Sequence, residues 1–592
     1  MMRSRLYRTI YGEVGSMDLS ELKKRMRKFT LKSLETYLGS EIVDTLLEWT
    51  PEHKTLFTKS KLSEMILTIH GTKILNKVEF RKDLIETFQP LEVESFRPFL
   101  KGVSEDSTNP YDLVNIISER PWKDDSTNRH LLELLKIDDD LFAKSDDKKD
   151  VKKAVGAYDR FFELLDYQFV IKQRILHNLT SGNELARMIV HMPTGTGKTK
   201  TAVHTICHHY NFNLKKQGLI IWIAHTTELL EQAYETFDSV WKHLGNGEIN
   251  LYRLYGSHSP SPDTFDYNGI VFCGIQKLMN LSDSNPKLME GLIEKCSLIV
   301  FDEAHKAPAE ETKKVIEKFM FKMPHMCDRA LIGLTATPGR ATEETSENRQ
   351  LVVMFDNKSI TIDIETLNNI NLSKLDAMNT RIEGGLIPYF QKNKILAKIR
   401  KEQLTYPENL TPSELEKIRE TATENGFEKE FTPKALETIG KNKSRNLAIM
   451  QRLMKLHEDE IPTIVFACSV KHGQLLSSML SIENIPNALV IGDMPSKERD
   501  DAIKAFKDKS SPIKILINFD VLTTGFDSTN IRCVFITRPT QSVVRYSQMI
   551  GRGLRGPKMG GNEECLLIDV KDNLEKYDEK LAFNHFDGYW RA

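Results

Sequence analysis

The feature that most constrains the fold is a glycine-rich turn that ends in a Lys-Thr pair. The turn reads Met192-Pro-Thr-Gly-Thr-Gly-Lys-Thr199; it follows the apolar run Met188–His191 and precedes an amphipathic stretch. Gly195 and Gly197 allow backbone N–H groups to point inward, and a helix N-terminus adds the positive end of its dipole. A strand, such a turn and a helix, in this order, form a phosphate-binding loop. The pattern therefore predicts an α/β fold with a phosphate site.

The residues of this turn have distinct expected roles. Lys198 is expected to reach the β- and γ-phosphates of ATP. The Thr199 hydroxyl is expected to bind Mg²⁺, because a hard cation prefers oxygen ligands. The backbone around the phosphates is assigned to Thr194, Gly195, Thr196 and Gly197. The alternative interpretation is a surface turn that contains Gly-Lys-Thr by chance.

A pair of carboxylates supplies the second half of the expected site. Asp302 and Glu303 follow the apolar run Leu298–Phe301, and side chains at the carboxyl end of a parallel strand face the crevice where ligands bind. Asp302 is expected to hold Mg²⁺ through water, and Glu303 to orient and polarise the attacking water. Such residues on a solvated face would be unremarkable, but here a strand precedes them and the phosphate loop lies upstream.

Two series of short apolar runs alternate with amphipathic stretches, which is typical of parallel strands with crossover helices. The first series is Met188–His191, Leu219–Ala224, Ile270–Gly274, Leu298–Asp302 and Leu331–Thr335. The second series is Thr463–Ala467, Ala488–Ile491, Ile515–Asn518, Cys533–Thr537 and Leu566–Asp569. We therefore expect two α/β domains, over residues 151–371 and 441–592.

The remaining segments lack this alternation. Residues 1–150 are expected to form a helical N-terminal domain, with helical stretches at Leu19–Leu38 and Val78–Phe88. Residues 372–440 are expected to form a mostly helical insert between the two α/β domains. Within it, Thr411-Pro-Ser-Glu414 has the pattern of a capped helix start with proline at the first position.

Five further motifs accompany the phosphate loop and the carboxylate pair, and the set covers about two thirds of the chain. They are Leu165-Asp-Tyr-Gln168, Ala224-His-Thr-Thr-Glu-Leu229, Leu334-Thr-Ala-Thr-Pro338, Thr523-Thr-Gly-Phe-Asp527 and Gln548-Met-Ile-Gly-Arg-Gly-Leu-Arg555. In composition and order, the set resembles the superfamily 2 DEAD/DEAH-box helicases. The resemblance implies two tandem RecA-like parallel-sheet domains that share one ATP site and drive a motor on nucleic acid.

The resemblance also implies roles for individual residues. It makes Gln168 the reader of the adenine base and adds Gly525 and Asp527 to the nucleotide site. The residues implied to couple hydrolysis to movement are His305, Thr335, Thr337 and Gln548. The residues implied to hold the nucleic-acid backbone are His225, Thr226, Thr227, Gln276, Thr523 and Thr524. Gly274 stands where the family often has threonine, and Gln276 with Lys277 could equally be a polar helix start without a ligand.

Arg552 and Arg555 are expected to bring positive charge to the γ-phosphate from the second α/β domain. Phosphoryl transfer is catalysed mainly by positioning and charge, so this arrangement makes hydrolysis depend on domain closure. Their three-residue spacing predicts that both lie on one face of a helix. Taken singly, an arginine on a helix is ordinarily a solvated or salt-bridged surface residue.

Composition limits the remaining possibilities. With 592 residues, 40% hydrophobic and 28% charged, the chain has the composition of a multidomain globular protein, and no apolar run is long enough to span a membrane. No secretory signal is visible, so we expect a cytoplasmic protein. The seven cysteines are scattered, and neither disulfides nor zinc is expected. A formal net charge of −1 means that any contact with nucleic acid has to be local.

The leading hypothesis is an ATP- and Mg²⁺-dependent helicase or translocase that steps along a nucleic-acid strand, with DNA favoured over RNA. The stretch from Thr337 through Ile387 also resembles helicases of restriction and phage-defence systems, which implies a bacterial anti-phage role. One alternative is an ATP-gated switch that recruits a partner, such as a nuclease, through residues 1–140. The other alternative is an RNA helicase. The oligomeric state stays open.

Overall fold

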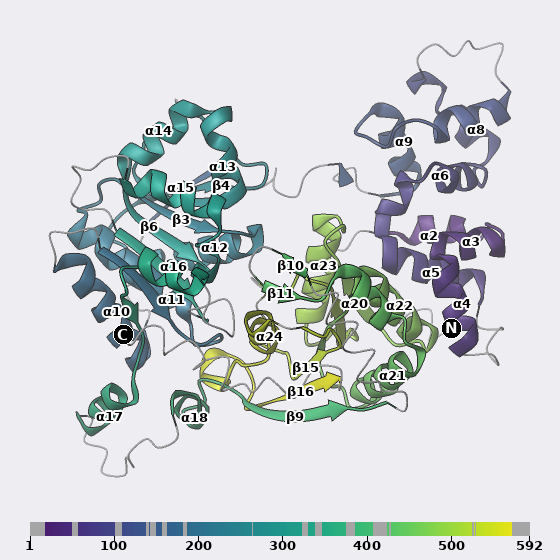
Figure 1. Ribbon diagram of the computed structural model, residues 1–592. Helices are drawn as coiled ribbons and strands as arrows, with labels where there is room; N and C mark the ends of the chain where they lie inside the picture. Colours follow the sequence, from purple (N-terminus) through teal and green to yellow (C-terminus); the bar gives the residue numbers. More distant parts are fainter. Residues whose placement is uncertain are drawn as a thin grey trace.

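The computed structural model describes residues 18–49, 57–100, 109–137, 141–142, 150–156, 163–181, 186–262, 265–321, 330–337, 346–373, 385–406, 423–425, 428–523, 526, 528–540 and 542–570. Figure 1 shows two α/β lobes and a group of N-terminal helices that lies beside the second lobe. Within the described parts of the chain, no helix is both long and apolar enough to cross a membrane.

Lobe 1 is an α/β sheet with strand order β1-β4-β5-β3-β6-β7-β2-β8, in which only the β1–β4 pair is antiparallel. Its strands are β1 (Lys152–Val155), β2 (Ala186–His191), β3 (Leu219–Ala224), β4 (Ile249–Leu254), β5 (Gly269–Gly274), β6 (Cys296–Asp302), β7 (Ala330–Thr335) and β8 (Ser359–Ile360). Its helices are α10 (Asp166–Thr180), α11 (Lys198–His208), the π-helix η6 (His209–Asn213), α12 (Thr227–Leu244), α13 (Ile275–Ser284), α14 (Pro286–Lys295), η8 (Ala304–Lys306), α15 (Glu310–Phe321), α16 (Ser346–Met354), α17 (Ile364–Ser373) and α18 (Leu386–Lys392).

Lobe 2 is a parallel sheet with strand order β13-β14-β12-β15-β16-β9. Its strands are β9 (Lys398–Leu404), β12 (Thr463–Phe466), β13 (Asn487–Val490), β14 (Ile515–Asn518), β15 (Cys533–Ile536) and β16 (Glu564–Val570). A separate hairpin joins β10 (Thr423–Asn425) to β11 (Glu428–Glu430). The helices are α20 (Pro433–Gly440), α21 (Lys443–Glu458), α22 (Val470–Ile482), α23 (Ser496–Lys507), α24 (Val543–Ile550) and η9 (Pro557–Met559).

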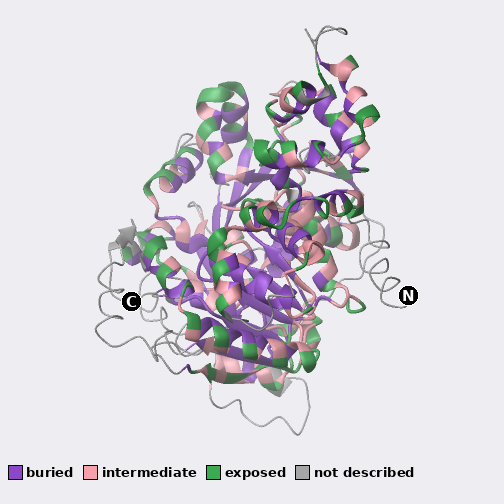
Figure 2. Ribbon diagram, turned by 90° about the vertical axis from the view of Figure 1, so that its right-hand side faces the viewer, coloured by how far each residue is buried: buried purple, intermediate pink, exposed green. Residues whose placement is uncertain are grey.

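The expected fold class of two tandem RecA-like domains is confirmed. Each of the ten apolar runs forms a strand, with ends that differ by no more than two residues. Central parallel strands are covered on both faces, so their sequences are continuously apolar, and β3 and β7 are indeed buried along their whole length. In Figure 2 the strands of both sheets are mostly coloured as buried.

In its described residues, the segment between the lobes contains strands as well as the expected helices. Besides α18 and α20, it contains β9, which pairs in parallel with β16 from Lys398 opposite Glu564 to Leu404 opposite Val570. β9 is an edge strand with alternating exposed and half-buried residues, and such a strand needs few apolar side chains. The expected helix start at residues 411–414 lies outside the described residues. The segment limits 1–150, 151–371, 372–440 and 441–592 stay predictions.

The N-terminal region is helical, as expected. Its helices are α2 (Ser20–Met26), α3 (Leu31–Leu38), α4 (Ser40–Trp49), α5 (Lys59–His70), η2 (Gly71–Asn76), α6 (Val78–Ile85), α7 (Pro90–Glu94), η3 (Arg97–Phe99), α8 (Pro110–Ser118) and α9 (Ser126–Leu134). The stretch expected to be helical from Leu19 to Leu38 is divided, because Thr30 caps a new helix by accepting a hydrogen bond from Ser33 N at 3.0 Å.

The N-terminal helices share one apolar core with lobe 2. A single cluster of buried side chains runs from Leu22 to Ile137 in the N-terminal region and from Ile449 to Val570 in lobe 2. α5 packs against α22 and β13 at this contact. Lobe 1 has its own two clusters, one on each side of its sheet. The N-terminal region and lobe 2 are therefore expected to unfold together.

This shared core can be tested with a truncation in lobe 2. Leu476 of α22 is fully buried in the shared cluster, so Leu476→Ala should lower the free energy of unfolding by about 2–5 kcal/mol. Amide hydrogen exchange should then speed up in α5 as well as in lobe 2. Ile221→Ala, at a fully buried position of lobe 1, is the matched control and should leave the exchange of α5 unchanged. Unaltered exchange in α5 of the Leu476→Ala protein would contradict a shared core.

Candidate nucleotide site between the lobes

The glycine-rich loop connects β2 to α11 at the carboxyl edge of the lobe 1 sheet. Gly195 and Gly197 have φ angles of +85° and +81°, which residues other than glycine rarely adopt. Gly197 is the residue that directly precedes α11, so Lys198 and Thr199 stand in the first turn of that helix. The positive end of the helix dipole therefore points at the space in front of the loop.

α10 holds this loop from behind. The Tyr167 hydroxyl and the Gln168 amide both donate hydrogen bonds to the carbonyl of Thr196, at 2.6 and 2.9 Å. The other end of the Gln168 amide accepts a hydrogen bond from Leu165 N at 3.0 Å, and the side chain is only 1% exposed. Gln168 thus supports the loop backbone and does not line the cavity, so its contact with an adenine base stays a prediction.

The carboxylate pair stands opposite the loop, at the end of β6. Lys198 Nζ lies 3.8 Å from Asp302 Oδ1 and 3.7 Å from Glu303 Oε1. Glu303 has a φ of +54°, a strained conformation for a residue with a side chain, and strain of this kind is typical of functional turns. Burial and the neighbouring negative charge of Glu303 raise the pKa of Asp302 to about 6, although Lys198 opposes the shift.

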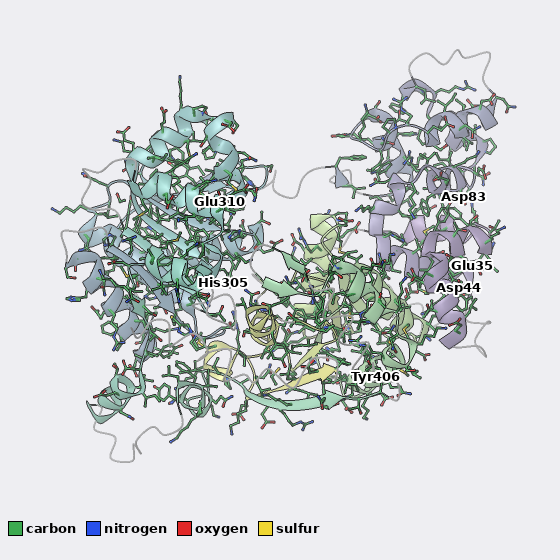
Figure 3. The ribbon with its side chains drawn as sticks, viewed as in Figure 1. Glu35, Asp44, Asp83, His305, Glu310 and Tyr406 are labelled. Carbon is green, nitrogen blue, oxygen red and sulfur yellow. The ribbon has the colours of Figure 1, made fainter. Side chains whose placement is uncertain are left out.

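A buried polar chain leads from Glu303 into lobe 1. His305 Nδ1 lies 3.4 Å from Glu303 Oε2 and 3.3 Å from the Thr335 hydroxyl. Thr335 in turn donates to the carbonyl of Thr337 at 2.8 Å and accepts from Thr337 N at 3.1 Å. The structure therefore connects three of the four predicted coupling residues to Glu303, with His305 as the one that lies next to it; His305 is labelled in Figure 3. The fourth, Gln548, lies in lobe 2, and its buried Nε2 has no hydrogen-bond partner among the described residues.

Lobe 2 contributes the two expected arginines, but not from one helical face. α24 ends at Ile550, so Arg552 and Arg555 both follow the helix, and Arg555 forms an isolated β-bridge with Leu396. Gly551 and Gly553 follow the end of the helix, at positions where neighbouring atoms leave no room for a side chain. A Cβ on Gly551 would lie 2.4 Å from Thr194 of the lobe 1 loop. The prediction that Arg552 and Arg555 lie on one face of a helix is therefore wrong. The predicted approach of this part of lobe 2 to the phosphate loop is present in the structure.

One cavity of about 460 Å³ brings these groups together, a size typical of small-ligand sites. The predicted residues that line it are Thr194, Gly195, Gly197, Lys198, Thr199, Asp302, Glu303, Arg552 and Arg555. Thr196 and Gln168 lie behind the loop instead. Gly525 and Asp527 lie outside the described residues, although Phe526 between them lines the cavity.

Sequence analysis missed several lining residues. Met559 of η9 reaches lobe 1 so closely that a Cβ on Gly197 would lie 3.1 Å from its terminal methyl group. The polar face of α12 also borders the cavity through Gln232, Glu235, Thr236 and Ser239. No sequence signal marks these residues, because a polar stripe on a helix ordinarily faces solvent. Met559 stands four residues after Arg555, and this closeness in the sequence is the only signal that could have pointed to it.

The predicted nucleic-acid residues lie at the starts of helices and loops. Thr226 caps α12 by accepting from Leu229 N at 3.3 Å, with His225 before it and Thr227 in the first turn. Gln276 is exposed in the first turn of α13. In lobe 2, the Thr523 hydroxyl donates to the carbonyl of Asp520 at 3.1 Å, and Thr524 lies outside the described residues. Their contacts with nucleic acid stay predictions.

Two family models match the chain over the two lobes. The model of the type III restriction enzyme res subunit matches residues 161–340, and the model of the helicase conserved C-terminal domain matches residues 445–556. The two lobes thus match domains of superfamily 2, of the DEAD/DEAH-like helicases related to restriction enzymes. The two matched domains form the ATP-hydrolysing core of such a helicase.

Three relatives of this helicase core are matched over only part of their own length. The putative ATP-dependent helicase IRC3 of Saccharomyces cerevisiae is 24% identical over 420 residues, which are 69% of this chain and 51% of that protein. Putative helicase 22 of Sulfolobus islandicus filamentous virus is 23% identical over 67% of this chain and 62% of its own. The putative type I restriction enzyme MjaIXP endonuclease subunit of Methanocaldococcus jannaschii is 22% identical over 80% of this chain and 43% of its own. The chain thus spans roughly half of these relatives, from 43% to 62% of their lengths.

The expected role of Glu303 can be tested in the helicase by Glu303→Gln. The substitution removes the charge that orients the attacking water but keeps the size of the side chain, so kcat for ATP hydrolysis should fall by about 10²–10³-fold while ATP still binds. Lys198→Ala should lose binding as well as turnover. Glu310→Gln, at an exposed residue of α15 labelled in Figure 3, is the matched control and should keep full activity. An active Glu303→Gln protein would refute the assignment.

The raised pKa of Asp302 predicts a change in stability of the nucleotide-free helicase. Because the pKa of Asp302 in the folded protein lies above the ordinary value of 3.8 for an aspartate, the fold loses stability as pH rises from about 4 to about 6. At pH 7.5, Asp302→Asn should therefore raise the melting temperature of lobe 1, by an amount equivalent to up to about 3 kcal/mol. The gain should shrink at pH 5. Calorimetry at pH 7.5 and at pH 5 measures the difference in melting temperature. A lower melting temperature of the variant at pH 7.5 would show that the attraction to Lys198 fully offsets the cost of burying the carboxylate.

Proposed function

We propose that the protein is an ATP-dependent motor that steps along DNA by closing and reopening its two lobes. One observation carries this proposal: Lys198, Asp302 and Glu303 of lobe 1 line the same cavity as Arg552 and Arg555 of lobe 2. A site divided in this way is complete only while the lobes are together, so each round of hydrolysis is tied to a change in their separation. The lobes then act alternately on the strand that they hold.

The residues of the cavity divide the catalytic work between them. Lys198 neutralises the phosphates from the loop side, while Glu303 stands where it can orient a water and take up its proton. Arg552 and Arg555 add positive charge from lobe 2, which stabilises the transition state because negative charge is spread over the transferred phosphoryl group. His305 then connects the state of Glu303 to Thr335 and Thr337, which lead away from the site.

The residues present fit a magnesium ion. Asp302 is nearly fully buried and its pKa is raised, so a divalent cation next to it would stabilise the ionised carboxylate. Asp302, through water, and the Thr199 hydroxyl would hold the ion, which would neutralise phosphate charge during hydrolysis. Mg²⁺ commonly uses one or two protein carboxylates together with substrate phosphates, and the site offers this donor set.

DNA is the track that the comparisons favour. The family model over lobe 1 and the archaeal relative that matches 80% of the chain both carry the name of restriction enzymes, a class defined by its action on DNA. The same names support a place in a restriction-type system, and we extend the proposal to an anti-phage role in a bacterial cytoplasm. RNA is the competing track, because ATP-dependent RNA helicase DBP3 of Debaryomyces hansenii also matches 62% of the chain at 22% identity.

A second candidate is an ATP-gated switch that recruits a partner such as a nuclease. The observation that favours it is the N-terminal region, which lies outside both matched domains and is firmly packed on lobe 2. A switch and a motor share the same ATP site. They differ in whether hydrolysis moves the protein along a strand.

The proposal is tested by the ATPase rate with single-stranded DNA, duplex DNA or RNA, followed by a strand-displacement assay. We expect DNA to stimulate turnover more than RNA does, and Arg552→Ala and Arg555→Ala each to lower the stimulated kcat by about 10³-fold. Lys558→Ala, an exposed cation of the nearby η9 outside the lining set, should keep the stimulation. No stimulation by any nucleic acid would refute a motor, and stimulation without translocation would favour the switch.

A further inference from the structure

Among the contacts that the N-terminal region makes with lobe 2, some lie on a short segment that also contacts lobe 1. This segment, Asp493–Arg499, follows β13 and includes the first turn of α23; we name it the joint. In Figure 1, α23 lies between the N-terminal helices and lobe 1. The N-terminal helices lie outside both matched family domains, so neither domain accounts for them.

Glu498 of the joint is embedded in the N-terminal region. Its Oε1 accepts hydrogen bonds from Thr72 N at 2.8 Å and from the Thr72 hydroxyl at 2.6 Å. Gly71 makes room for the carboxylate, because a Cβ there would lie 1.7 Å from Glu498 Oε2. Burial raises the pKa of Glu498, and the two donors partly offset the loss of water. A carboxylate enclosed in this way fixes the helix that carries it.

The other end of the joint is held by the residue next to Thr72. Lys73 Nζ lies 3.2 Å from the Asp493 carboxylate and 3.2 Å from the Asp493 carbonyl. This pair is more exposed than the Glu498 contact, so its contribution to stability is small. Its geometric effect is that two neighbouring residues of η2 contact both ends of the joint: Lys73 contacts Asp493 at its beginning, and Thr72 contacts Glu498 near its end.

Arg499, the residue after Glu498, faces the opposite partner. Arg499 Nη1 lies 3.2 Å from Glu228 Oε1 in the first turn of α12, and both side chains are largely covered. Neighbouring residues of a helix are turned by about 100° from each other, so Glu498 and Arg499 can contact different domains at the same time. Glu228 directly follows Thr226 and Thr227, the predicted backbone contacts of lobe 1. The ion pair therefore spans the two lobes beside the expected strand path.

We propose that the N-terminal region positions Arg499 and thereby sets how the two lobes meet: Thr72 fixes Glu498, Glu498 fixes the first turn of α23, and Arg499 pairs with Glu228 across the lobes. Thr72 and Glu498 are positioning residues, since neither lines the nucleotide cavity. The effect on the lobe separation follows from the contacts alone. The effect on stimulation by a strand rests on the proposed function.

The test compares Thr72→Val with Lys61→Met in the full chain. Thr72→Val removes one donor to Glu498 at almost constant volume. Lys61→Met removes a hydrogen bond of 2.9 Å to Asn484, which also joins the N-terminal region to lobe 2 but lies away from the joint. Fluorescent labels on lobe 1 and lobe 2 report the separation of the lobes without nucleic acid, and the ATPase rate with single-stranded DNA reports the coupling.

We expect Thr72→Val to broaden the distribution of lobe separations and to lower the ATPase rate with single-stranded DNA about fivefold. Lys61→Met should match the unaltered protein in both measurements. Charge reversal tests the ion pair: Arg499→Glu should behave like Thr72→Val, and the double variant with Glu228→Arg should recover the normal separation.

Two results would overturn the inference. One is a Thr72→Val protein whose lobe separation equals that of the Lys61→Met control. The other is an Arg499→Glu, Glu228→Arg double variant whose lobe separation is no closer to normal than that of Arg499→Glu alone. If DNA fails to stimulate even the unaltered protein, the proposed function fails, while the lobe separations still decide the role of the joint. Gly71→Ala provides a stronger version of the first variant, because it displaces the Glu498 carboxylate itself.

Discussion

The nucleotide site depends on one lysine that faces two buried carboxylates. Lys198 lies within 4 Å of both Asp302 and Glu303, where water is nearly excluded and charges interact strongly. One positive charge beside two negative charges leaves the group incompletely balanced, and burial together with the charge of Glu303 raises the pKa of Asp302. Additional positive charge is therefore favourable at this point. The lobe 2 arginines bring it, which gives the buried pair a physical connection to the approach of the second lobe.

That approach depends on glycine as much as on arginine. Gly551 packs on Thr194 of the other lobe so closely that a Cβ there would lie 2.4 Å from its side chain. A larger residue at position 551 would therefore collide with the phosphate loop and move Arg552 and Arg555 away from it. At Gly197 a Cβ would first meet the Gln168 amide of lobe 1, at 2.4 Å, so this glycine lets α10 approach the loop. Gly551 thus helps to set the distance between the arginine charges and the phosphate loop.

The parts of this architecture that sequence predicts are those in which one local pattern has one structural meaning. Strands buried on both faces are continuously apolar, so the central strands and the loop after β2 could be located. β9 was missed because an edge strand has a polar sequence, and β4 because it carries Arg253, whose buried charge is paired with Glu231 at 2.9 Å. The orientation of Gln168 and the contact between Thr72 and Glu498 could not be predicted, since both depend on partners that the fold brings from elsewhere in the chain.

The connection between the lobes limits how they can separate. Residues 394–398 are tied to lobe 2 by backbone hydrogen bonds, from Ala397 N to the Leu554 carbonyl at 2.8 Å and from Gly556 N to the Ile395 carbonyl at 2.9 Å. The same segment is also hydrogen-bonded to α18, because Ile395 N and Leu396 N both donate to the Phe390 carbonyl, at 2.8 and 3.1 Å. Towards α10, Ile395 and Leu396 join the apolar cluster around Tyr167. Directional hydrogen bonds resist sliding, whereas apolar contacts tolerate it. The connection should therefore travel with lobe 2, and opening should occur along its contact with α10 and the phosphate loop.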